Sequence, residues 1–185
     1  RREFVQTNYV AFMERVNKHY ESIARQLHDR PFFDIAYDLI NEPFDHKHDA
    51  FNKAMKELTA RVRAIDPVHL LYVEPSEAWG AIEQLKLIEP TGDPLTVYSF
   101  HDYNFRLFKP GDRWPAEERD ITNICRQWTE AFKFAIRHGA AMHCGEFGGF
   151  DNSTDDELAQ LTLMNDFFRI FDQFDMQFHY YSGRS

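Results

Sequence analysis

The sequence contains little cysteine and has no long apolar run. Cys125 and Cys144 are the only cysteines among its 185 residues, and we interpret both as small buried side chains rather than as a redox or metal pair. No apolar stretch approaches the roughly 20 residues of a membrane span, and no signal peptide is recognisable. No membrane partner is therefore expected.

Basic side chains are also scarce relative to acidic ones. Lys and Arg number 21 and Asp and Glu number 30, which gives a net charge of −9. This balance argues against nucleic acid or an anionic membrane as the main partner and favours a neutral ligand. An apolar content of 43% excludes a disordered chain, and the length suits one core. We expect residues 1–185 to form a single domain.

The segment 37–43, which ends in Asn41, Glu42 and Pro43, carries the first candidate for chemistry. An apolar stretch at 32–36 precedes it and predicts a buried strand, and Pro43 cannot continue a strand ladder, so Glu42 falls at the strand's carboxyl end. Folds of the α/β class keep their active sites there. An Asn-Glu-Pro tripeptide alone is also typical of a turn with an exposed glutamate.

A second acid in the same kind of position strengthens the interpretation. Residues 140–144 read as another buried strand, and Glu146 follows it between Gly145 and the pair Gly148-Gly149. The glycines allow the backbone to turn sharply beside the carboxylate. Two carboxylates at two strand ends indicate paired acid chemistry.

Helical and strand patterns alternate along the chain. Helices are expected at 4–27, 51–65, 121–136 and 158–171, with a brief one opening at Ser76, and strands at 32–36, 70–73, 95–100, 140–144 and 176–181. Each crossover between strands is more than a dozen residues long, which predicts parallel strands in right-handed connection. The predicted fold class is α/β with about five parallel strands and flanking helices.

Retaining glycoside hydrolysis needs one protonated carboxyl and one carboxylate held about 5 Å apart. Glu42 and Glu146 are candidates for these two groups. Asn41 is placed to hydrogen-bond a sugar hydroxyl, and Tyr103 to donate to the nucleophile's oxygen and keep it ionised. His101 either tunes one of the acids or binds substrate, and a hydrogen-bonded buried imidazole is the alternative interpretation.

The order of these motifs resembles glycoside hydrolase family 5, the cellulase-type branch of the (β/α)₈ retaining clan. The resemblance is carried by segments 41–43, 101–103 and 145–148 and by an aromatic last strand, and it covers nearly the whole chain. It implies that Glu42 is the acid/base at the end of strand four and that Glu146 is the nucleophile on strand seven. It also implies that Asn41, His101 and Tyr103 belong to the substrate site.

Two departures from the family pattern stand out. Strands one to three have no counterpart, so a truncated TIM barrel is expected, and the family's Arg and His ahead of Asn-Glu are missing; Arg30 and His28 lie at a helix end and do not replace them. The family's strand-eight Trp corresponds to Tyr181, a smaller stacking face. Trp79 and Phe105 are further candidates for contacts with sugar rings.

These observations lead to two hypotheses about function. The first is a retaining endo-β-1,4-glucanase that acts on β-linked polysaccharide, and the second is a catalytically impaired remnant that only binds saccharide. We expect no cofactor. A metal site at His46, His48 and Asp49 is a weaker alternative, because a polar loop that opens a helix is usually solvated.

An incomplete barrel leaves two sheet edges that must be covered. Missing sequence, local segments or a second copy of the chain could cover these edges. We favour a homodimer through the open edges, with the helix at 4–27 shielding one side. A secreted or extracellular location is expected from the polysaccharide substrate that the resemblance implies.

Overall fold

A computed structural model of the chain describes residues 8–43, 47–77, 79–103, 114–115, 120–148 and 157–181. Its centre is one five-stranded sheet in the order β1-β2-β3-β4-β5, and every neighbouring pair is parallel. The strands are β1 (Tyr37–Leu39), β2 (Leu71–Val73), β3 (Thr96–Asp102), β4 (Ala141–Gly148) and β5 (Gln177–Tyr181). The predicted α/β class and the five parallel strands are confirmed, and the sheet forms a half-barrel with flanking helices.

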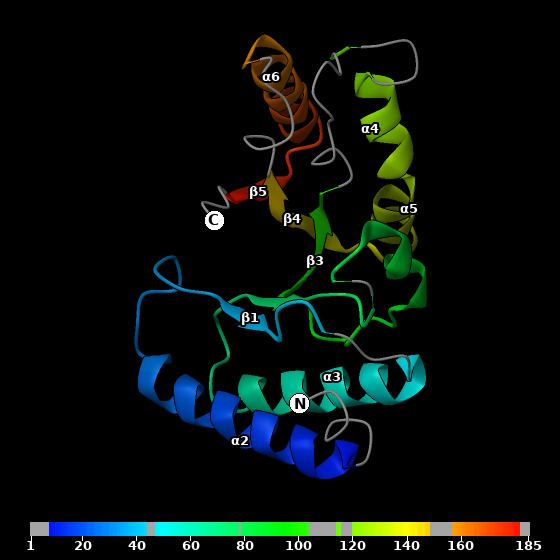
Figure 1. Cartoon of the computed structure of the whole chain (residues 1–185). Helices are drawn as coiled ribbons and strands as arrows, with labels where there is room; N and C mark the ends of the chain where they lie inside the picture. The colour runs from blue at the N-terminus through cyan, green and yellow to red at the C-terminus, as the bar shows by residue number, and fades with distance from the viewer. Residues whose placement is uncertain are drawn as a thin grey trace.

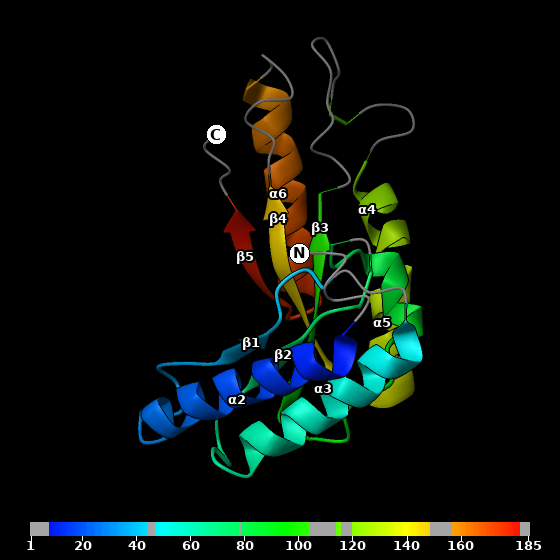
Figure 2. The ribbon, with the colours of Figure 1, turned by 60° about the horizontal axis from the view of Figure 1, so that its bottom comes forward.

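The helices lie outside the sheet in two groups (Figures 1 and 2). In one group α2 (Tyr9–Leu27) packs beside α3 (His48–Arg63), next to β1 and β2. The other group contains α4 (Ile121–Gln127), α5 (Thr129–His138) and α6 (Glu157–Gln173), which lie towards β3, β4 and β5. A short 3₁₀ helix, η1 (Ile82–Leu87), packs against α5. No helix in the described ranges is long and apolar enough to cross a membrane.

The core is densest between β3, β4 and the second group of helices. Every residue of β3 is buried, as is usual for a parallel strand that is covered on both faces. The Trp128 ring contacts Phe100, Phe167 and Phe171, and Phe147 joins the same cluster. Burial of such side chains contributes roughly 1.5–3 kcal/mol each. This aromatic cluster holds β3 and β4 against the second group of helices.

The strand predicted at 32–36 is wrong. Residues 32–34 form a turn, and Phe32 and Phe33 are 68% and 76% exposed, while the strand begins at Tyr37. The physical reason is that an apolar run alone does not show which of its residues face the core. Glu42 nevertheless lies just beyond the carboxyl end of β1.

Two helical predictions also need correction. The helix expected at 121–136 is interrupted at Trp128, whose indole N–H donates to buried Asp102 at 2.7 Å, and Ile136 is 84% exposed instead of sharing the buried face. The brief helix expected to open at Ser76 is instead η1, which begins at Ile82. Trp79 therefore lies in the turn that precedes η1.

Candidate active site

Four neighbouring strands each bring one titratable side chain to the carboxyl edge of the sheet. Glu42 follows β1, Glu74 follows β2, His101 is the penultimate residue of β3 and Glu146 lies in β4. His101 and Glu146 are register partners across the β3–β4 ladder. Because parallel strands end at the same edge, residues far apart in the sequence meet here.

His101 lies at the centre of three carboxylates. Its Nδ1 is 3.0 Å from Oε1 of Glu42 and 3.7 Å from Oε2 of Glu146, and its Nε2 is 3.1 Å from Oε1 of Glu74. The side chains of His101 and Glu74 are buried, whereas those of Glu42 and Glu146 are partly open to solvent. The imidazole therefore links the two accessible acids to a buried one.

These surroundings hold the His101 ring in its protonated form at neutral pH. Burial by itself lowers the pKa of His101, but the hydrogen bond and charge of Glu74 outweigh it, together with the contacts to Glu42 and Glu146. The resulting pKa is about 9, against an ordinary value of 6.5. The imidazolium thus places a positive charge within 3.7 Å of a carboxylate oxygen of each accessible acid.

Glu42 and Glu146 face each other across this ring. One carboxylate oxygen of each lies with Nδ1 of His101 in a group whose members are all within 4.8 Å of one another. The Tyr103 hydroxyl donates to Oε2 of Glu146 at 2.5 Å and so orients that carboxylate. Burial, then the Glu146 contact, raises the pKa of Tyr103 above its ordinary value, so the phenol stays a donor.

Two glycines make room for the imidazole. A Cβ on Gly145 would collide with Oγ of Ser99 and lie 3.2 Å from Nε2 of His101, and a Cβ on Gly80 would lie 3.1 Å from Cγ of His101. The Gly80 carbonyl also accepts the His101 backbone N–H at 2.8 Å. Close approach of the backbone to His101 therefore requires glycine at both positions.

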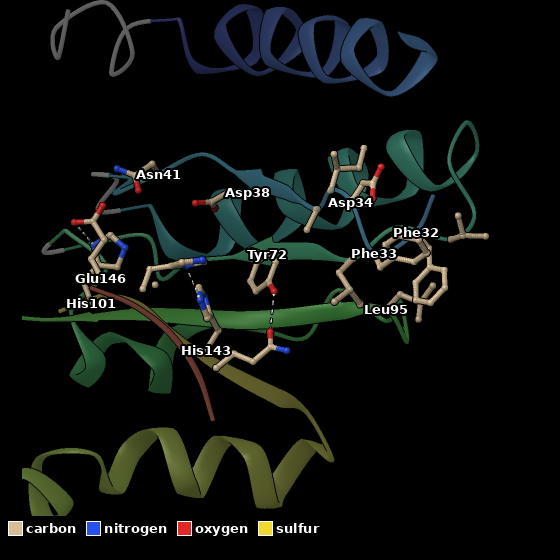
Figure 3. A pocket seen from close by; sticks show the side chains of 17 residues that line it. Phe32, Phe33, Asp34, Asp38, Asn41, Tyr72, Leu95, His101, His143 and Glu146 are labelled. Atoms are coloured by element: carbon tan, nitrogen blue, oxygen red, sulfur yellow. Dashed lines mark hydrogen bonds and ion pairs between the residues drawn. The ribbon is translucent and has the colours of Figure 1, made fainter. Parts of the chain in front are cut away.

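A cleft of about 770 Å³ runs from these acids along the inner face of the sheet (Figure 3). His101 and Glu146 lie at one end, while Phe32 and Phe33 lie at the other, with Tyr72 and His143 between them. The aromatic pair meets edge to face, with ring centroids 5.4 Å apart. The cleft is thus polar in the middle and aromatic at its far end.

The inner face carries two further titratable groups that line the cleft. Asp38 keeps an exposed surface, but partial loss of solvent around its carboxyl, together with the charge of Glu74, raises its pKa to about 6, although His101 opposes this shift. Burial lowers the pKa of His143 to about 4, and its Nε2 lies 3.0 Å from Nδ1 of His179. These groups occupy the middle of the cleft rather than the acid end.

The other predicted site residues take different positions. Asn41 is exposed and lines the cleft beside Glu42. Tyr181 ends β5 and meets the ring of Tyr103 edge to face at 6.4 Å. Trp79 is 55% exposed in the turn before η1. Phe105 lies outside the described residues.

The structure places the weaker metal candidates away from the acid cluster. Nδ1 of His48 lies 2.7 Å from the Ser76 hydroxyl and its Nε2 lies 3.4 Å from Glu77, while His46 is outside the described residues. Among described residues, the group of His and acids close enough to share an ion is Glu42, His101 and Glu146. Because His101 is protonated at neutral pH, acid–base chemistry fits this group better than metal binding.

Sequence reasoning missed Glu74 as a member of the site. Its Oε2 accepts the backbone N–H of Glu42 at 2.7 Å, so it holds both Glu42 and His101. A signal was present, because Glu74-Pro75 follows its strand in the same way as Glu42-Pro43 follows β1. The pair is not sufficient by itself, because Glu89-Pro90 precedes β3 instead of ending a strand.

Comparisons with known proteins point to one family. A family model described as "Cellulase (glycosyl hydrolase family 5)" matches residues 4–182. Endoglucanase C of Acetivibrio thermocellus and endoglucanase C307 of Clostridium sp. are each 33% identical over 70 residues. Each of these alignments covers 38% of this chain and 20% of the relative.

Solved structures resemble the chain over almost its whole length. Cel5A from Thermotoga maritima superimposes with a TM-score of 0.85 at 18% identity, and a hyperthermophilic endo-β-1,4-glucanase in complex with substrate with 0.85 at 16%. Cel5A in complex with mannotriose gives 0.84. At these identities the likeness shows the fold alone. The chain spans about 62% of the length of the first two structures and 63% of the third.

Proposed function

The chain belongs to glycosyl hydrolase family 5, and from that premise we propose that it hydrolyses β-1,4-linked glucan internally with retention of configuration. Glu42 is the acid/base and Glu146 is the nucleophile. The observation that carries the proposal is the separation of their carboxylate oxygens, which lie within 4.8 Å of each other beside a cleft that Glu146 lines. Retaining enzymes hold their two carboxyl groups about 5 Å apart, whereas inverting enzymes leave room for a water between them.

The chemistry proceeds in two steps. Glu42 gives its proton to the leaving glycosidic oxygen while a Glu146 oxygen attacks the anomeric carbon, which breaks the glycosidic bond and forms a glycosyl ester. Water then attacks the same carbon, Glu42 takes the water's proton, and Glu146 leaves as a carboxylate. Both acids return to their starting forms, so no cofactor is consumed.

The neighbouring residues support these roles. The Tyr103 hydroxyl fixes the orientation of the attacking carboxylate, and the protonated His101 lies between the two acids. Asn41 presents its amide to the cleft, where a sugar hydroxyl would be recognised. Tyr181 and Trp79 expose ring faces that suit stacking on pyranose rings, and we propose them as substrate contacts.

The test is release of reducing sugar from carboxymethyl cellulose and, in parallel, from β-mannan. Glu146→Gln should abolish release, because the amide is a poor nucleophile for the anomeric carbon. Glu77→Gln is a matched control on a partly exposed glutamate outside the acid cluster and should retain activity. Proton NMR of the first-formed product should show retention, and an inverted product would exclude the proposed mechanism.

A saccharide-binding remnant is the second candidate. The observation that favours it is the open inner face of the half-barrel, where the cleft is bounded by one sheet instead of a closed ring of strands. In that case oligosaccharide would bind without release of reducing sugar at any protein concentration. Calorimetric titration with cellotetraose, run beside the hydrolysis assay, separates the two functions.

We also propose that two copies of the chain associate through the sheet edges. Strands β1 and β5 are the edges of the described sheet, and all five residues of β5 are exposed. Unpaired parallel edges with this exposure favour covering by another chain. Light scattering gives the solution mass directly, and a well-folded monomer would refute the dimer. We further propose that the chain acts outside the cell, where polymeric glucan is found.

A further inference from the structure

The turn that carries Glu42 has an unusual backbone. Ile40 has φ +66° and Glu42 has φ +47°, so two residues without glycine's freedom occupy the left-handed region on either side of Asn41. A β-branched residue such as isoleucine is a genuine outlier there. Conformations of this kind persist only where surrounding groups enforce them.

One enforcing group comes from the helix behind the sheet. The hydroxyl of Tyr20, in α2, donates to the carbonyl oxygen of Asp38 at 2.7 Å and accepts the backbone N–H of Ile40 at 3.2 Å. The Tyr20 hydroxyl thus bridges the backbone of Asp38 and Ile40 in the first half of the turn. Burial raises the pKa of Tyr20, so the phenol keeps the proton that this bond needs.

A second group holds the turn from the inside. The buried Glu74 accepts the backbone N–H of Glu42 at 2.7 Å. The left-handed segment is therefore held at Ile40 by Tyr20 of α2 and at Glu42 by Glu74, which follows β2. In this conformation, Oε1 of Glu42 lies 3.0 Å from Nδ1 of His101.

We propose that Tyr20 is a positioning residue that aims Glu42 into the acid cluster by holding Ile40 in its left-handed conformation. Tyr20 touches neither His101 nor Glu146 in the described contacts, and its effect passes through the backbone of the turn. Without the hydroxyl, the N–H of Ile40 loses its acceptor and the residue relaxes towards its preferred negative φ. Glu42 then swings away from His101. The kinetic part of this inference rests on the proposed function.

The experiment compares Tyr20→Phe with Tyr98→Phe. Tyr98 is a matched control, because its hydroxyl also accepts a backbone N–H, that of Thr91 at 2.8 Å, and it lies in β3 well before the strand reaches His101. Thermal unfolding, kcat, KM and the NMR titration of the His101 ring are measured for both variants and for the unchanged chain. The titration needs no turnover.

Both substitutions should lower the melting temperature by a similar amount. Only Tyr20→Phe should lower kcat, by roughly 10- to 100-fold, with KM within about twofold, because displacing a catalytic group by about 1 Å costs this much. Only Tyr20→Phe should also move the His101 pKa from about 9 towards 6.5, since a carboxylate has left its side. Equal kcat values and equal His101 titrations in the two variants would overturn the proposal.

A second variant tests the route through the backbone. Glycine adopts a positive φ without strain, so Ile40→Gly in the Tyr20→Phe background should recover part of the lost kcat and return the His101 titration towards that of the unchanged chain. No recovery in either measurement would refute the role of the left-handed turn. If the unchanged chain shows no hydrolysis, the proposed function fails, and the His101 titration alone still decides whether Tyr20 positions Glu42.

Discussion

The stability of the fold should fall as the pH rises through the titration of His101. In the folded chain the pKa of His101 is about 9, against an ordinary value of 6.5. Because the folded value is the higher one, protonation of His101 stabilises the fold fully below about pH 6.5, and this contribution disappears as the pH passes about 9. At 1.36 kcal/mol per pKa unit, the loss amounts to about 3 kcal/mol.

The variant that isolates this effect is Glu74→Gln. Glu74 is buried and contributes the largest favourable interaction with the His101 ring, while glutamine keeps an oxygen that can accept the backbone N–H of Glu42. We expect the alkaline loss of stability to be smaller than in the unchanged chain by more than half of the roughly 3 kcal/mol that His101 contributes. Glu77→Gln, a matched change at a partly exposed glutamate, should leave the loss intact.

The assay is equilibrium unfolding in urea at about pH 6.5, 8 and 9.5 at fixed ionic strength, because the free energy of unfolding at each pH gives the linkage directly. Burial also raises the pKa of the Cys125 and Cys144 thiols, which adds a loss of stability near pH 9. Glu74→Gln shares this loss with the unchanged chain, so the difference between the two chains isolates His101. Asp38 and His143 titrate mainly at lower pH. Asp38 has a pKa of about 6, and His143 has one of about 4. A free energy of unfolding that stays constant from pH 6.5 to 9.5, or an equal loss in Glu74→Gln, would refute the reasoning.

Two further predictions concern the packing around the site and at the opposite end of the sheet. Gly145→Ala should lower the free energy of unfolding by roughly 1–3 kcal/mol, because the new Cβ collides with Oγ of Ser99, and a thermal melt that matches the unchanged chain would contradict the glycine requirement. Asp66→Asn should cost about 1–3 kcal/mol in urea unfolding, since the fully buried Asp66 accepts the Tyr37 hydroxyl at 2.5 Å and contacts Nδ1 of His69 at 2.6 Å.

Much of the fold could be predicted because its helices bury one face. The periodic apolar residues of 4–27 correspond to α2, and the long crossovers correctly required parallel strands. The helix expected at 158–171 is present as α6, but its predicted face is wrong: Leu158, Leu161 and Phe168 are 74%, 64% and 38% exposed. The buried face contains Leu163, Phe167 and Ile170 instead. The misplaced strand at 32–36 shows the limit of this reasoning. Phe32 and Phe33 are apolar but exposed, because in an open half-barrel they border the cleft instead of a covered core.

The candidate site was predictable only in part. The acids could be found because each follows an apolar stretch and has a Pro or Gly beside it, and Glu42 and Glu146 do lie together. The role of Glu74 and the left-handed backbone of Ile40 depend on contacts between elements that are distant in sequence, and no local pattern carries that information. The catalytic roles of Glu42 and Glu146 remain predictions for the assays above.

The arrangement of the acids does not depend on a closed barrel. The four groups that form the cluster come from β1, β2, β3 and β4, and each of these strands is hydrogen-bonded to the next, so the cluster crosses no open edge. What an open half-barrel leaves uncovered is the inner face, where the cleft extends past Tyr72 and His143 to Phe32. Substrate contacts beyond the reacting carbon depend on that face. On the proposed function, contacts along that face set saccharide binding and KM, while Glu42 and Glu146 stay aligned for the chemical step.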